Sequence, residues 1–367
     1  MPPRVRTPGG ENHVAEWFGH RIYPVVAGTA EALADQKAHR CPLITVATGT
    51  SSTCVKPPNS QGVCTVSACS NGPRQDWLVC PYRALDPDLL EDAVRRMFGH
   101  DAEAGLTLIP VTLLSGATRK KSFLKRVKSG KPAIVYFQNR LGGEISLSAT
   151  ERSPEMAFDA TMVEVLYQDG ALTIGRYGIF EIQTMDFHGS YKHAVKDLSD
   201  ALRLQGDGFP EQVQLHPEWS GNKIEGPNLA NVFKRTFYQM MFKFQIGAHE
   251  ASAGCVLAIP KSVWDSWQRH LGKPDLVLQP DGTYRLAIEA DEEKAPAAWI
   301  YVFDLDQSDT TSPNDVKLLQ VIATDAASLS YYALTVAPEA ALAQGGSVDG
   351  IATSIRTRLL RYLPELT

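Results

Sequence analysis

The segment 158–191 constrains the fold more than any other part of this chain, because it predicts one long β-hairpin. Two runs of β-forming residues flank the turn Gln168-Asp169-Gly170, and Asp-Gly is a strong signal for a tight hairpin turn. If the strands fold back about this turn, the numbers of paired residues add up to roughly 339 or 340. This register places Asp159 opposite Phe180 or Glu181.

Three polar side chains are expected to converge at one end of this hairpin. Side chains alternate along a strand, so Glu181 and Gln183 share a face while Ile182 points away. Two carboxylates held together, Asp159 and Glu181, repel each other unless a cation neutralises them, and hard oxygen ligands suit Mg²⁺. An Asp on one strand followed by Glu-x-Lys on the next is the layout of the PD-(D/E)xK nuclease superfamily. A solvated hairpin with surface acids is the alternative interpretation of the same spacing.

Length and composition allow either one large domain or two smaller ones, since 44% of the 367 residues are hydrophobic. No apolar run reaches the ~20 residues that span a bilayer. The N-terminal residues contain no apolar stretch typical of a secretory signal, so we expect a cytoplasmic protein. The net charge of −5 does not indicate nucleic-acid binding by itself; a local basic face would matter more.

The cysteines are concentrated in one part of the chain. Cys255 stands apart from the other five, which are Cys41, Cys54, Cys64, Cys69 and Cys80. In a chain without a secretion signal, such a cluster favours a metal over disulfides, and an all-Cys shell favours a structural metal. The spacings are irregular and no CxxC pair occurs, so buried free thiols remain an alternative. Turn-forming residues between 41 and 80 predict a loop-like segment that a metal would hold together.

One segment, Thr118–Lys131, is clearly basic. Its cations are Arg119, Lys120, Lys121, Lys125, Arg126, Lys128 and Lys131, with no acid among them. Such a run suits a phosphate backbone, whereas an ordinary basic surface helix is the alternative.

The order of the remaining elements predicts an α/β fold with a mixed central sheet flanked by helices. Asp86 to Gly99 is expected to be a helix capped by Asp86, and 228–244 a long helix whose Phe and Met residues face the core. Residues 206–217 are expected to form a loop. The predicted division is an N-terminal arm and Cys segment, 1–85, followed by a core with C-terminal additions, 86–367.

Longer runs of residues carry a more specific signal than these patterns. They include Phe18–Arg21, Asp76–Pro81, Arg83–Pro87, Glu181–Val195, Glu225–Leu229 and Asn231–Met240. In these runs the chain closely resembles the NotI-like family of type II restriction endonucleases, which includes EagI.

The resemblance implies a PD-(D/E)xK fold, a homodimer and a Mg²⁺-dependent cut in duplex DNA that leaves 5′-phosphate and 3′-hydroxyl ends. It suggests a GC-rich palindrome of the GCGGCCGC or CGGCCG type, and a cognate DNA methyltransferase in the same cell. The alternative from another class is a non-catalytic DNA-binding protein built on an inactive nuclease fold.

The resemblance also implies roles for particular residues. Asp159, Glu181 and Gln183 take the catalytic positions, with Glu144 as a helper, and Asp159 and Glu181 are the Mg²⁺ ligands. No Pro precedes Asp159, and Gln183 stands where Lys is usual. Because Gln carries no charge, it can only orient the attacking water or a phosphate oxygen.

A structural iron is implied as well, although four thiolates would accept zinc equally. Its expected ligands are Cys41, Cys54, Cys64 and Cys80. Cys69 is then a spare thiol, and Cys255 has no assigned role. Reading guanine favours basic side chains in the major groove. The candidates near the catalytic face are Lys192, His193, Lys234 and Arg235.

Overall fold

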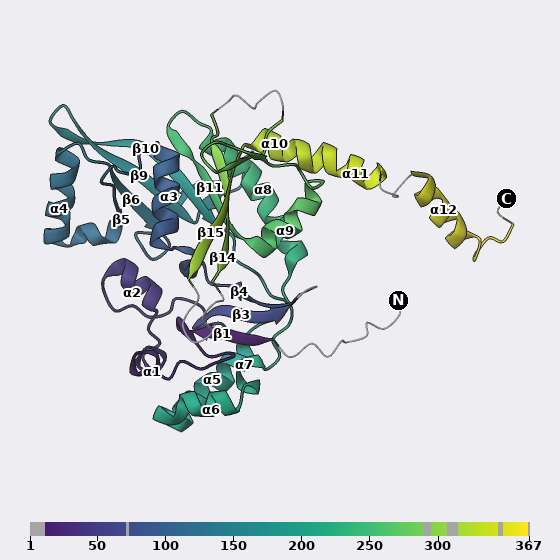
Figure 1. Cartoon of the computed structure of the whole chain (residues 1–367), viewed down its shortest axis with the longest axis horizontal. Coiled ribbons are helices and arrows are strands. Elements are labelled where there is room, and N and C mark those ends of the chain that lie inside the picture. Colours follow the sequence, from purple (N-terminus) through teal and green to yellow (C-terminus); the bar gives the residue numbers. More distant parts are fainter. Residues whose placement is uncertain (1–11, 71–72, 289–294, 307–314, 344–347, 366–367) are drawn as a thin grey trace.

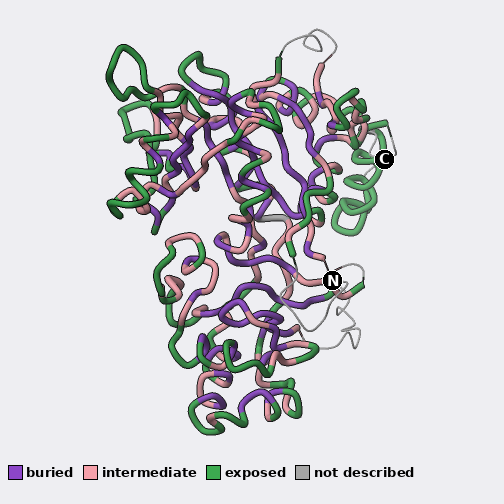
Figure 2. Tube along the Cα trace, turned by 60° about the vertical axis from the view of Figure 1, so that its left-hand side comes forward, coloured by how far each residue is buried: buried purple, intermediate pink, exposed green. Residues whose placement is uncertain are grey.

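The computed structural model describes residues 12–70, 73–288, 295–306, 315–343 and 348–365. It is a mixed α/β fold with a large mixed central sheet flanked by helices, as the sequence predicts (Figure 1). A smaller sheet, with four strands in the part of the chain that the structure describes, lies below the central sheet in that view. Buried strands form the interior of both parts, whereas α12 (Val348–Leu359) is exposed (Figure 2).

Among the described residues, the central sheet has nine strands. In spatial order they are β12 (Val277–Leu278), β13 (Tyr284–Arg285), β15 (Val316–Thr324), β14 (Ala298–Leu305), β11 (Ser252–Pro260), β10 (Ala171–Ile182), β9 (Ala160–Gln168), β6 (Ala133–Gln138) and β5 (Thr107–Pro110). Strands β10, β11 and β14 run parallel, and every residue of β11 is buried. Such burial is typical of a parallel strand covered by helices on both faces.

Strands β9 and β10 form the predicted hairpin about the turn Asp169-Gly170. Gln168 pairs with Ala171 and Ala160 pairs with Phe180, so the paired numbers add up to 339 near the turn and 340 at the far end. The register changes once, between Ile174 and Tyr177. Gly170 has φ +80°, a conformation that glycine adopts without a steric penalty. The register predicted from the turn is therefore confirmed.

Different helices cover the two faces of the sheet at this hairpin. Phe180 points toward α3 (Pro87–Phe98), in a cluster that includes Leu90 and Met97. Ile179 points the other way, into the cluster that includes Phe244 of α8 (Leu229–Gly247). Because side chains alternate, Glu181 lies on the α8 face.

A second helix, α4 (Ala117–Lys128), packs on the same face as α8. Phe123 and Val127 are its buried side chains, and they cluster with Val163 of β9. Val163 pairs with Tyr177, two residues before Ile179, so it shares the face of Ile179.

The smaller sheet is built mainly from N-terminal strands. Its order is β2 (His20–Arg21), β1 (His13–Trp17), β3 (Val63–Cys69) and β4 (Arg74–Leu78). The helices α1 (Ala30–Lys37) and α2 (Pro42–Thr48) lie beside it (Figure 1). The expectation of a loop-like segment between 41 and 80 is wrong, since this segment supplies two strands and a helix. Val63 to Ala68 are buried on both faces, so the alternation that usually marks a strand is missing.

Helices from later in the chain complete this smaller part. They are α5 (Lys192–Gln205), α6 (Phe209–Leu215) and α7 (Glu218–Gly221). The Phe209 ring of α6 lies 5.9 Å from the Trp17 ring of β1. The loop expected over 206–217 is therefore wrong, because Phe209 and Val213 bury one face of a short helix. The division at residue 85 stays a prediction.

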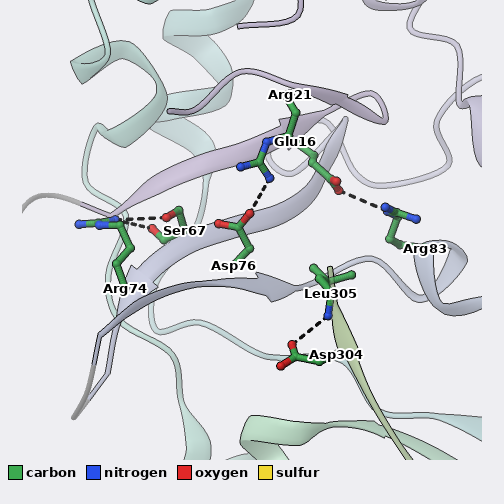
Figure 3. A network of polar contacts seen from close by, with 8 residues as sticks. All are labelled: Glu16, Arg21, Ser67, Arg74, Asp76, Arg83, Asp304 and Leu305. Atoms are coloured by element: carbon green, nitrogen blue, oxygen red, sulfur yellow. Dashed lines mark hydrogen bonds and ion pairs between the residues drawn. The ribbon is translucent and has the colours of Figure 1, made fainter. Parts of the chain in front are cut away.

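Buried ion pairs hold the smaller sheet together (Figure 3). Arg21 Nη1 lies 2.5 Å from Asp76 Oδ2, and Arg83 Nε lies 3.4 Å from Glu16 Oε2. Glu16 is completely buried, and a buried charge is tolerated when it is paired. Arg83 belongs to the 3₁₀ turn Pro81–Ala84, so the pair fixes the chain directly after Cys80.

The remaining elements follow in chain order. They are the 3₁₀ turn Val111–Ser115, β7 (Ile145–Leu147), β8 (Met156–Phe158), the 3₁₀ turn Gly206–Gly208, α9 (Lys261–His270), α10 (Ala326–Tyr331), a π-helical turn (Tyr332–Val336) and α11 (Ala337–Ala343). In the described ranges, none of the helices combines the length and apolar character needed to cross a bilayer.

Candidate active site at the end of the hairpin

Asp159 and Glu181 lie side by side where the hairpin ends. Asp159 directly precedes β9, and Glu181 is the second-last residue of β10. The Asp159 backbone N–H donates to Glu181 Oε1 at 3.2 Å, and the Ile182 N–H donates to Asp159 Oδ2 at 2.9 Å. Each of the two carboxylates that the sequence predicted to converge therefore accepts a hydrogen bond from the backbone of the other strand segment.

The environment of Glu181 favours its neutral form. Its side chain is buried, and burial raises the pKa of its carboxyl from 4.5 to about 8, with a further contribution from the charge of Asp159. A carboxyl of this kind binds either a proton or a cation, since a bare charge there is costly. The pair has the electrostatics of a cation site.

Lys243 of α8 provides one such cation. Its ammonium is ion-paired with Glu181 Oε2, and only 4% and 7% of the two side chains are exposed. The same ammonium lies 5.8 Å from the centre of the Phe158 ring. Sequence reasoning placed Lys243 in a core helix without a role. A signal existed, because Lys243 follows the buried Met240 by three residues and so lies on the apolar stripe of α8.

Gln183 is held by hydrogen bonds on both ends of its amide. Its Oε1 accepts from Thr236 Oγ1 of α8 at 2.5 Å, and its Nε2 donates to the Thr184 carbonyl at 2.5 Å. Its backbone N–H donates to the Ala258 carbonyl of β11 at 2.9 Å. The side chain predicted to orient a water or a phosphate oxygen is thus fixed beside Glu181. Thr236 is a second residue that the sequence did not single out.

Glu144 lies near the pair but does not contact it. In the ribbon of β7 and β8, Ile145 pairs with Phe158, so Glu144 and Asp159 are the next residues at the same end. The exposed Glu144 accepts a hydrogen bond from Asn139 Nδ2 at 3.1 Å. Its role as a helper stays a prediction.

The predicted DNA contacts lie on two helices that follow the strand end. Lys192 and His193 are at the start of α5, while Lys234 and Arg235 are exposed on the first half of α8. Arg235 forms an ion pair of 2.7 Å with Asp186, which follows β10. This ion pair links the first half of α8 to the segment that leaves the strand end. Base contacts of the four residues stay a prediction.

The cysteines of the smaller part gather in one place. Cys41, Cys64 and Cys80 share a buried cluster, and Cys54 packs against it. Burial raises the pKa of the Cys41 thiol to about 11, while a hydrogen bond with Cys64 lowers the pKa of Cys80. All six cysteines are free thiols. Cys69 is exposed and outside this cluster, and Cys255 is buried in β11.

The types of donor atom, though not their arrangement, match the two predicted metals. Four thiols in one cluster suit iron or zinc, and a carboxylate pair suits Mg²⁺, which commonly takes one or two protein carboxylates. In the described part of the chain, no group of three or more His, Cys, Asp or Glu side chains is arranged to enclose a metal ion. Both metal sites stay predictions.

No family model matches the chain, and no curated protein matches its sequence.

Proposed function

We propose that this chain is a Mg²⁺-dependent type II site-specific deoxyribonuclease with a PD-(D/E)xK active site. The observation that carries the proposal is the contact between Asp159 and Glu181, with Lys243 paired to the same Glu181. Acidic side chains brought together beside a lysine at the end of a hairpin can hold a divalent cation against a scissile phosphodiester.

Asp159 and Glu181 would hold Mg²⁺. The ion would polarise the scissile phosphate and lower the pKa of a bound water. The donor set agrees with this role, because two carboxylates leave room for water and phosphate oxygens in the shell of the ion.

Lys243 supplies the charge that Gln183 lacks. The superfamily usually carries Lys at the third position of the motif, where this chain has Gln183. Here an ammonium reaches Glu181 from α8, opposes the effect of burial and favours the ionised carboxyl. Gln183, fixed by Thr236, orients the attacking water or a phosphate oxygen.

In the reaction, the water oxygen forms a bond to phosphorus and the bond from phosphorus to the 3′-oxygen breaks. The leaving oxygen takes a proton, which gives 5′-phosphate and 3′-hydroxyl ends. Two copies of the chain related by a twofold axis would read a palindrome and cut both strands. We propose a GC-rich site of the GCGGCCGC or CGGCCG type, cytoplasmic action, and a cognate methyltransferase that protects the host DNA.

The test is cleavage of GC-rich plasmid DNA with Mg²⁺, followed by mapping of the ends. The wild type should give discrete fragments, whereas Asp159→Asn and Glu181→Gln should bind the duplex without cutting it. Normal cleavage by either variant would refute the assignment. A gel shift without fragments from the wild type would support the non-catalytic DNA-binding alternative.

Glu164→Gln is the matched control. Glu164 lies on β9 of the same hairpin, but its carboxylate faces the other side of the sheet, 3.8 Å from His100 Nε2. The same loss of charge at this position should leave cleavage unchanged.

A further inference from the structure

Helix α4 presents a row of exposed lysines. Within the described ranges, none of them forms an ion pair with an acid. Lys128 instead lies 5.5 Å from the centre of the Tyr167 ring. The row consists of Lys120, Lys121, Lys125 and Lys128.

These lysines line one open hollow of about 630 Å³. The other residues of its wall are Ala117, Leu124 and Ser129, so the wall contains no acid. Since the chain as a whole has a net charge of −5, this is a local concentration of positive charge.

The helix is fixed in place by its opposite side. Phe123 and Val127 are buried against β6 and β9, so the lysines project from an anchored scaffold. A long side chain on an anchored helix loses less entropy on binding than one on a mobile loop.

The sheet topology places this lysine row on the face of the sheet that carries Glu181. Val163, against which α4 packs, shares its face with Ile179 and Glu181. Glu164, the acid next to Val163, points to the opposite face and contacts His100 there. It therefore does not neutralise the row.

We infer that the lysine row of α4 binds the phosphate backbone of duplex DNA, as a sequence-independent contact separate from the carboxylate pair. This inference rests on the proposed function and adds a second DNA contact to it. Lys120 and Lys128 are about 12 Å apart along the helix axis, from a rise of 1.5 Å per residue. Successive phosphates of one strand are about 3.4 Å apart along the duplex axis, so the row spans three or four of them.

The experiment measures duplex binding at several salt concentrations. The test variant carries K120Q, K121Q, K125Q and K128Q, and Gln keeps the helix propensity close to that of Lys. Fluorescence anisotropy with a labelled duplex, in EDTA, gives the slope of log affinity against log salt concentration. Circular dichroism checks that the variant is folded. A control variant removes four exposed cations elsewhere: K273Q, K317Q, R356Q and R358Q.

The slope of the test variant should be shallower by about 3, because each lost phosphate contact removes about 0.9. The affinity loss should be equal for a GC-rich duplex and a scrambled one, since phosphates carry no sequence information. An unchanged slope, or an equal change in the control variant, overturns the inference. If the wild type binds neither duplex, the proposed function itself fails, and that result is distinct from loss of the α4 contact alone.

Discussion

Replacing the buried pair of Glu181 and Lys243 by neutral side chains should change how stability depends on pH. The double variant Glu181→Gln/Lys243→Met keeps the approximate shape of both side chains and removes both charges. Changing both together avoids leaving one buried charge without its partner, which alone typically costs about 3–5 kcal/mol.

The magnitude follows from the pKa of Glu181. Its carboxyl has a pKa of about 8 in the folded metal-free protein and 4.5 as its ordinary value. Because the folded pKa is raised, the stability contribution of this group is complete below pH 4.5 and is lost as the pH rises toward 8. From pH 5 to pH 8 the loss is about 4 kcal/mol, at about 1.4 kcal/mol for each pH unit.

Urea denaturation of both proteins in EDTA, at pH 5, 6, 7 and 8, measures this effect. Titrating groups outside the replaced pair are common to the two proteins, so their contributions cancel in the difference between the two unfolding free energies. The unfolding free energy of the variant, relative to that of the wild type, should rise by about 4 kcal/mol from pH 5 to pH 8, within a factor of two. A difference that stays constant across the range would refute the reasoning, because it would mean that Glu181 titrates as an exposed carboxyl.

Three further predictions concern separate features of the chain. Thr236→Val removes the hydroxyl that fixes Gln183. It should lower kcat on the order of tenfold in single-turnover cleavage, while the thermal unfolding midpoint stays unchanged within a few degrees. An unchanged kcat would contradict the positioning role. Cys64→Ser should lower the bound iron or zinc measured by elemental analysis, whereas Cys69→Ser, outside the thiol cluster, should not; equal metal content in both would exclude the cluster as the site. Asp86→Ala should destabilise the protein by about 1 kcal/mol in urea denaturation, because Asp86 caps α3, while Asp86→Asn retains an acceptor and should cost less.

Local features of the sequence were sufficient to predict the hairpin and the helix α3, which Asp86 caps. The Asp169-Gly170 turn determines the register over short range, and the register brings Asp159 to Glu181. The cap of α3 likewise depends on Asp86 and the two amides that follow it closely. These interactions join residues that are close in sequence or connected by one turn.

Interactions between distant segments were not predictable in this way. Lys243 is 62 residues from Glu181 in the sequence. The two side chains meet only because α8 packs on β10. Residues Val63 to Ala68 of β3 are buried on both faces, so this strand lacks the alternation that identifies a strand. Packing of this kind depends on which faces of distant elements meet, and local patterns in the sequence do not indicate those pairings.

By itself, the sequence determined that two carboxylates meet at the end of one hairpin, since a tight turn leaves a single register in which the apolar face is buried. Only the tertiary structure decided which groups surround them. It brought Lys243 and Thr236 from α8, and it placed the lysine row of α4 on the same sheet face. The physical reason is that turn geometry acts between neighbours, whereas helix placement is set by burial of apolar area across the whole chain.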